Sequence, residues 1–82
     1  MDYKPFIQNN NLKKFRTEKG LLQKQVAAML GLKSDVRVIR WEKGQAIPSL
    51  INLMKLSKIY GVLPHKLYSQ VYDNVVVVNL SK

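Results

Sequence analysis

The placement of glycine limits most strongly what this chain can fold into. Each of the four glycines follows a short segment with apolar residues at helical spacing, and a glycine readily adopts the left-handed conformation that ends a helix. Val26, Ala27 and Leu30, for example, form one apolar stripe that stops at Gly31. The pattern predicts an all-α fold of five short helices after an irregular start. We expect these helices at about residues 9–19, 23–30, 34–43, 49–60 and 64–71.

Capping residues mark where these helices begin. The first helix begins at the asparagine run 9–11, the third at Ser34 or Asp35, and the fourth at Ser49. Asparagine, serine and aspartate side chains accept hydrogen bonds from the first backbone N–H groups of a helix. Pro64 fits the first turn of the fifth helix. With no repeat or internal linker, the sequence predicts one domain, residues 1–72, followed by a distinct tail, residues 73–82.

The strong positive charge of the chain limits the kinds of macromolecule that it is expected to bind. Fourteen Lys and Arg residues against five Asp and Glu give a formal net charge of +9, and such a field attracts nucleic acid or an anionic membrane surface. The longest apolar run, Val75–Val78, is too short to span a membrane, and the first residues lack a signal-peptide pattern. The absence of cysteine excludes disulfides and thiolate metal sites and fits a reducing cytoplasm.

The sequence offers little for catalysis. Its single histidine, His65, is expected to be exposed in the first turn of the fifth helix, and the five carboxylates form no pair suited to acid–base chemistry. Neither a glycine-rich phosphate loop nor a metal-ligand spacing is visible. We therefore expect a protein that is not an enzyme, with no catalytic residue, no metal site and no cofactor.

Residues 23–44 have the layout of a helix-turn-helix. The first of two short helices carries a small residue, Ala27, where a second helix can cross closely. The second presents Arg37 and Arg40, three residues apart, opposite its apolar stripe. In a helix-turn-helix the first helix braces against the DNA backbone and the second offers its polar face to base edges in the major groove. This layout predicts double-stranded DNA as the partner, read by residues 35–43.

The same residues resemble the lambda-repressor-like family of regulators, also called the Cro and xenobiotic-response-element family. The resemblance covers residues 9–71 and implies a five-helix DNA-binding domain whose helix-turn-helix unit spans about residues 23–43. The matching pieces are Leu12-Lys13-Lys14-Phe15-Arg16, Lys19-Gly20-Leu21, Gln23, Val26-Ala27, Leu30-Gly31-Leu32, Arg40-Trp41-Glu42-Lys43-Gly44, Pro48-Ser49-Leu50 and Tyr60-Gly61-Val62.

The resemblance implies DNA contacts at particular positions. The glutamine that opens the second helix touches a phosphate and steadies the recognition helix, and Lys43 lies where a flanking phosphate is held. The outward face of the recognition helix reads bases or grips the backbone, with Arg40 favoured for guanine and Arg37 for phosphate. The full set of expected DNA-binding residues is Gln23, Lys33, Ser34, Asp35, Val36, Arg37, Arg40 and Lys43.

Other positions are expected to be structural. Arg16 and Glu42 match a pair that forms an internal salt bridge in related repressors, tying the first helix to the end of the third. Ala27, Gly31, Val38 and Trp41 belong to the helix contacts, the turn and the core.

Two departures from the family pattern affect the turn and the start of the first helix in the helix-turn-helix. One residue more than usual separates Gly31 from Trp41, which predicts a longer turn, and Leu22 replaces the usual Ser or Thr cap before Gln23. Asp35 is unusual on a DNA-facing surface. It either caps the helix, which we favour, or accepts a hydrogen bond from the amino group of cytosine.

The tail leaves further interpretations open. Its β-branched run, Val75–Val78, favours an extended strand, so a C-terminal β-strand is a candidate addition to the all-α fold. That segment would pair with a second copy in a homodimer, lie extended over the core, or join a partner protein's sheet as in an antitoxin. RNA binding is a third hypothesis, weakened because no stacking aromatic residues interleave the basic ones.

Overall fold

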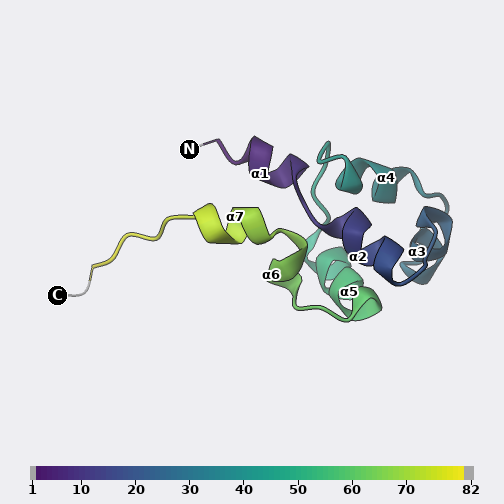
Figure 1. Cartoon of the computed structure of the whole chain (residues 1–82). Helices are drawn as coiled ribbons and strands as arrows, with labels where there is room; N and C mark the ends of the chain where they lie inside the picture. Colours follow the sequence, from purple (N-terminus) through teal and green to yellow (C-terminus); the bar gives the residue numbers. More distant parts are fainter. Residues whose placement is uncertain (1, 81–82) are drawn as a thin grey trace.

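The computed structural model describes residues 2–80, and these residues form seven short helices (Figure 1). This confirms the expected all-α class. The chain order is α1 (Lys4–Gln8), α2 (Leu12–Glu18), α3 (Gln23–Met29), α4 (Val36–Glu42), α5 (Leu50–Tyr60), α6 (Pro64–Leu67) and α7 (Ser69–Asn74).

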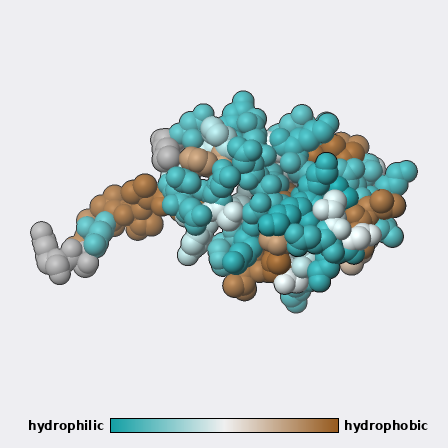
Figure 2. Space-filling view, viewed as in Figure 1, coloured by the Kyte–Doolittle hydropathy of each residue, from teal (hydrophilic) through white to brown (hydrophobic). Residues whose placement is uncertain are grey.

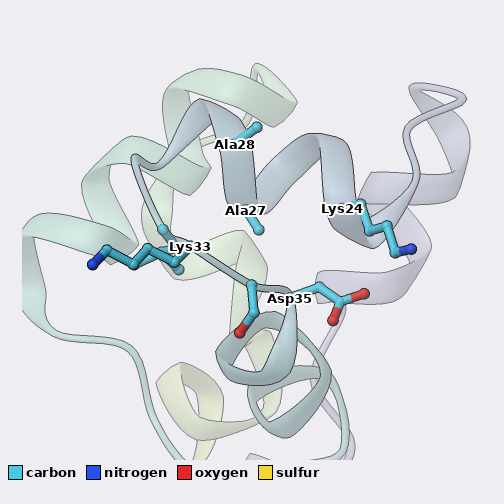
Figure 3. Close-up of a pocket in the computed structure, with 7 residues that line it drawn as sticks. Lys24, Ala27, Ala28, Lys33 and Asp35 are labelled. Carbon is cyan, nitrogen blue, oxygen red and sulfur yellow. The ribbon is translucent and has the colours of Figure 1, made fainter.

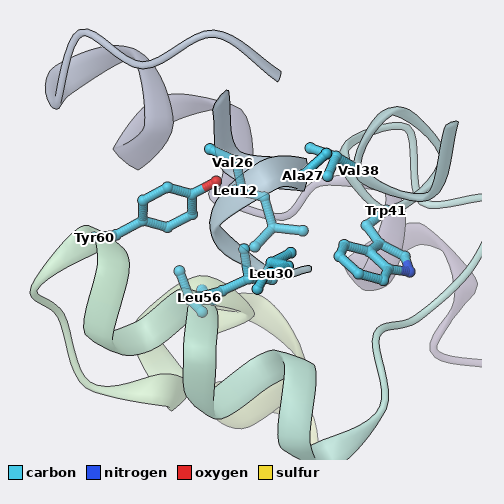
Figure 4. Close-up of a cluster of buried hydrophobic side chains, with 9 residues drawn as sticks. Leu12, Val26, Ala27, Leu30, Val38, Trp41, Leu56 and Tyr60 are labelled. Carbon is cyan, nitrogen blue, oxygen red and sulfur yellow. The ribbon is translucent and has the colours of Figure 1, made fainter. Parts of the chain in front are cut away.

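A small core lies where α2, α3, α4, α5 and α6 meet. Figure 4 shows apolar side chains from several of these helices converging on one point. Trp41 is the largest of them and comes from α4, so burying it fixes α4 to the domain. The buried apolar residues are Leu12, Val26, Ala27, Leu30, Val38, Trp41, Leu56, Tyr60 and Leu67.

The expected irregular start was wrong, because residues 4–8 form the helix α1. No side chain of α1 is buried, so the sequence carries no apolar stripe that would reveal it. Contacts with distant elements hold α1 in place: it packs on α7 (Figure 1), and its last residue, Gln8, lies against Gly44. Tertiary contact therefore stabilises α1 more than helix propensity does.

The expected single fifth helix is also wrong, because it divides at Tyr68 into α6 and α7. Tyr68 has φ −130° and ψ 52°, which are not helical values. Asn11 explains the break: its side-chain amide donates to the Lys66 carbonyl (3.0 Å) and the Ser69 hydroxyl (2.9 Å), and its backbone N–H donates to the Leu67 carbonyl (2.9 Å). These bonds satisfy carbonyls that a continuous helix would otherwise use.

The described part of the tail leaves the body as an extended segment (Figure 1), with its valines exposed. Within residues 2–80 no strand is formed, so the candidate C-terminal strand is not part of this fold. Figure 2 shows the valine segment as an apolar projection beside a mainly hydrophilic face of the body.

The Tyr68 hydroxyl is buried without a hydrogen-bond partner in the part of the chain that the structure describes, and burial raises the pKa of Tyr68 to about 12. We expect Tyr68→Phe to raise the free energy of unfolding by about 1 kcal/mol, because it removes a desolvated hydroxyl. Since the unfolded tyrosine ionises near pH 10, this group's contribution to stability is full below pH 10 and falls as pH rises toward 12. The gain from the variant should therefore grow above about pH 10.

Urea unfolding at pH 7 and near pH 10.5 measures this difference. Tyr72→Phe is the matched control, since Tyr72 is exposed. If Tyr68→Phe is less stable than the wild-type protein at both pH values, the hydroxyl has a partner and the account of this side chain is wrong.

Candidate nucleic-acid interface

The helix α4 has one buried and one exposed side. Val38 and Trp41 are buried in the core, whereas Arg37 and Arg40 are exposed three residues apart on the outer side. Lys43, the residue after the last turn, is also exposed. Helical spacing puts these cations on one face. This face therefore offers three positive side chains on a helix that the core holds fixed.

An ion pair locks the end of α4 to α2. The Arg16 guanidinium donates from Nε to Glu42 Oε2 (2.6 Å) and from an Nη atom to Glu42 Oε1 (3.0 Å). Its other Nη atom donates to the Leu21 carbonyl (2.9 Å). Only 9 % of the Arg16 side chain and 5 % of the Glu42 side chain are exposed. The hydrogen bond to Glu42 raises the pKa of Arg16 above its usual range, so the guanidinium stays charged.

Gln23 joins the same network from the first residue of α3. Its side-chain amide donates to Glu42 Oε1 at 3.0 Å, so one carboxylate holds α2, α3 and α4 together. The amide nitrogen carries two hydrogens, and one remains for a group outside the domain. Gln23 thus stands at the start of α3, hydrogen-bonded to the last residue of α4, with a second amide hydrogen left to donate.

The start of α3 has a cap that the sequence analysis missed. Gln25, three residues after Leu22, accepts a hydrogen bond from the Leu22 backbone N–H through its side-chain oxygen (2.8 Å). This is the reciprocal half of a capping box, which needs Glu or Gln at the third helical position. The glutamine at that spacing was the sequence signal for it. The helix therefore has an ordered N-terminus without a Ser or Thr cap.

The turn between α3 and α4 spans residues 30–35. Gly31 has φ +76°, and the Leu32 N–H donates back to the Ala27 carbonyl (2.9 Å), which closes the end of α3. Lys33 and Ser34 follow in exposed bends. Figure 3 shows a shallow hollow at this turn, lined by Lys24, Ala27, Ala28, Leu32, Lys33, Ser34 and Asp35.

Asp35 stands at the N-cap position of α4, and its backbone carbonyl accepts from the Ile39 N–H (3.0 Å). Its side chain makes no capping hydrogen bond. The residue therefore takes the position expected of a cap without the side-chain bond that defines one, and its carboxylate is not used by the first turn of the helix.

A second hollow, of about 320 Å³, lies between the exposed side of α4 and the start of α5. Ser49 caps α5, since its hydroxyl accepts from the Asn52 N–H (3.2 Å). The hollow is lined by Arg37, Arg40, Trp41, Ala46, Ile47, Ser49 and Asn52. It brings both arginines of α4 next to a helix N-terminus, where backbone N–H groups and the helix dipole favour negative charge.

Asn10 is a supporting residue whose role the sequence analysis missed. Its side-chain amide donates to the Trp41 carbonyl (2.9 Å) in the last turn of α4 and to the Ile7 carbonyl (2.8 Å). Its side-chain oxygen accepts from the Leu12 N–H (3.0 Å) at the start of α2. The asparagine run does mark this helix start, but no local pattern indicates a bond to a residue 31 positions away.

Within residues 2–80, no group of three or more His, Cys, Asp or Glu side chains gathers to hold a metal ion. None of the helices in this range has the length and apolar character needed to cross a membrane.

Comparison with known proteins finds a match at the level of family. The helix-turn-helix family profile matches residues 12–67. The restriction-modification controller protein C.AhdI from Aeromonas hydrophila is similar in structure, with a TM-score of 0.67 and 33 % identity over 80 % of this chain and 100 % of that one. A hypothetical transcription factor, NHTF from Neisseria, has a TM-score of 0.66 and 27 % identity over 82 % of this chain and 75 % of that one. No curated protein matches significantly.

Proposed function

The chain belongs to the lambda-repressor-like helix-turn-helix family and is a DNA-binding transcriptional regulator, and on this premise we propose that it is a repressor that reads the major groove of a palindromic operator with α4. The observation that carries the proposal is the division of α4 into a locked and an exposed side. Val38, Trp41 and the Arg16–Glu42 pair fix the helix, so its exposed arginines meet DNA in a set orientation.

The two arginines have different roles in this proposal. Arg40 makes a bidentate contact with the O6 and N7 atoms of guanine, a pairing that contributes roughly 1–3 kcal/mol of discrimination against another base. Arg37 grips a phosphate beside it. Val36 is exposed in the first turn of α4 and presents an apolar surface for the methyl group of a thymine.

The remaining positions hold the DNA backbone or flank the bases. The second amide hydrogen of Gln23, the exposed Lys33 and Ser34 of the turn, and Lys43 donate to phosphates. For Asp35, the absence of a side-chain capping bond supports contact with the amino group of cytosine over the capping role.

The substitution Arg40→Ala tests the base contact. We expect it to relax sequence preference at one position of the operator, because the lost interaction is with one base. Lys43→Ala is the control among the exposed cations. It should weaken binding to all sequences alike and flatten the dependence of log affinity on log salt by about one unit. Affinities for a panel of single-base operator variants, measured at several salt concentrations, separate the two effects. Equal loss on every sequence for Arg40→Ala would assign this arginine to the backbone.

A regulator of this kind has no need of catalysis or a cofactor, and it acts in the bacterial cytoplasm where DNA lies. A palindromic operator presents two half-sites about one helical turn apart, and a homodimer reads both. We therefore propose that the active species is a dimer.

The exposed tail supports a second candidate function, binding of a partner protein. In an extended segment successive side chains point to opposite sides, so the consecutive valines make both sides apolar. Such a segment fits a sheet whose two faces are both covered. A protein-interaction module, such as an antitoxin, would use the tail in this way. Selection of DNA sites discriminates the two functions, since a folded protein that enriches no sequence favours the partner-binding one.

A further inference from the structure

The helix α1 is held against the C-terminal end of α4. The side-chain amide of Asn10 donates both to the Ile7 carbonyl of α1 (2.8 Å) and to the Trp41 carbonyl of α4 (2.9 Å). Gln8, the last residue of α1, packs on Gly44, where a Cβ would lie 2.5 Å from the Gln8 Cα. Packing on α7 supports α1 as well. Figure 1 shows the end of α1 beside the loop that leaves α4.

This position puts one side of α1 next to the loop that carries Lys43. Gln8 packs on Gly44, the residue between Lys43 and Gln45, whose side chains are both exposed. Lys4 lies one helical turn before Gln8 and shares its side of α1, because residues four apart fall on one face of a helix. Lys4 and Gln8 are exposed too. The helix therefore presents a cation and an amide beside the loop that we propose to hold a DNA phosphate.

The side chains of this surface suit a phosphate. Within residues 2–80 neither the Lys4 ammonium nor the Gln8 side-chain amide has a hydrogen bond or an ion pair, so both are free to bind an outside group. Lysine offers N–H donors only, and glutamine adds two more, whereas a phosphate oxygen only accepts. One carboxylate lies nearby, that of Asp2, which accepts from the Lys4 backbone N–H (2.9 Å). With Lys43 included, the surface keeps a net positive charge.

We propose that α1 binds a phosphate of the operator backbone through Lys4 and Gln8, next to the phosphate that Lys43 holds. The proposal rests on the proposed operator-binding function and adds a contact from an element that precedes the matched part of the family, residues 12–67. Because Asn10 ties α1 to α4, the contact is in place before DNA arrives. It adds affinity and fixes orientation but reads no base.

The dependence of affinity on salt tests this contact. Lys4→Ala removes one phosphate contact, so the slope of log affinity against log salt should flatten by about 0.9, and affinity near 0.15 M salt should fall about fivefold. Lys58→Ala is the matched control, because it removes the same charge from the last turn of α5. Lys58 lies roughly 13 Å along the helix axis from the Ser49 cap beside α4, beyond a Debye length of about 8 Å. This control should keep the wild-type slope.

Two further measurements separate a direct contact from a change in folding. In the first, methylphosphonates neutralise one phosphate at a time in a duplex that carries the motif enriched by the wild-type protein. One of these phosphates should matter to the wild-type protein and not to Lys4→Ala. In the second, Asp2→Asn removes the nearby negative charge and keeps an acceptor for the Lys4 N–H, so it should tighten binding. A purely structural role of α1 does not produce that gain.

Three results would overturn the proposal: a Lys4→Ala variant with the wild-type slope, the same sensitive phosphates in both proteins, or an Asp2→Asn variant that binds DNA no more tightly. Circular dichroism establishes that each variant is folded, and Lys4→Gln replaces Lys4→Ala if the latter unfolds. The slopes are also measured on an unrelated duplex of the same length, since phosphate contacts need no particular sequence. They therefore test α1 even if no motif is enriched, and it is the lack of enrichment that marks failure of the proposed function.

Discussion

Replacing Glu42 with alanine should lower the free energy of unfolding by about 3–5 kcal/mol, because it leaves the Arg16 guanidinium buried without its counter-ion. The guanidinium would keep only its bond to the Leu21 carbonyl, and Gln23 would lose its acceptor at the same time. A domain of this size is only marginally stable, so a loss of this magnitude would leave much of the protein unfolded. The same substitution should weaken DNA binding strongly, since α2 and α3 lose their shared hydrogen-bonded contact with the end of α4.

Urea unfolding followed by circular dichroism measures the loss. Glu18→Ala is the control for removing one negative charge, because Glu18 is exposed at the end of α2, and it should change stability by less than about 0.5 kcal/mol. The double variant Arg16→Met, Glu42→Leu should recover most of the stability, since it removes both buried charges. If Glu42→Ala unfolds like Glu18→Ala, the pair does not hold these helices together.

Replacing Gly44 with alanine should destabilise the protein for two reasons. The same substitution at Gly31 tells the two apart. Gly44 has φ +71°, a conformation that costs a residue with a side chain about 1–2 kcal/mol. A Cβ at this position would also lie 2.5 Å from the Cα of Gln8, so α1 must move away. Gly31, which likewise follows a helix of the helix-turn-helix, has φ +76° with nothing within 4 Å of such a Cβ.

We therefore expect Gly31→Ala to lower the free energy of unfolding by the conformational cost alone. Gly44→Ala should lower it by about 3 kcal/mol in all. Removing residues 1–8 should make the two substitutions equally costly, because no backbone would then face position 44. Chemical unfolding of six proteins gives the comparison: the full-length chain and the chain without residues 1–8, each unsubstituted, with Gly31→Ala and with Gly44→Ala. If Gly44→Ala still costs more than Gly31→Ala without residues 1–8, α1 does not cover this glycine.

Much of the fold was predictable because helix ends carry local signals. The ends of α2, α3, α4 and α5 fall within one or two residues of the glycines that the sequence analysis used. What was missed has no local signal. The helix α1 depends on Gly44 and α7, and the break at Tyr68 depends on Asn11, more than fifty residues earlier.

The candidate site also has some features that the sequence predicted and others that it did not. Arg37 and Arg40 could be placed on the outer side of their helix because Trp41, four and one residues later, belongs on the inner side. The extra residue between Gly31 and Trp41 predicted the longer turn over residues 30–35, whereas the Asp35 side chain without a capping bond could not be derived from spacing. The second role of Gln23, as a donor to Glu42, depends on the crossing of two helices.

Selection of binding sites from a random duplex DNA library, at about 0.15 M salt, tests the central claim most directly. We expect enrichment of a palindromic motif whose half-site centres lie about 10–10.5 base pairs apart, the separation that places two recognition helices in successive major grooves. A folded protein that enriches no sequence would contradict the claim that α4 reads DNA, and would leave the tail as the functional part of this chain.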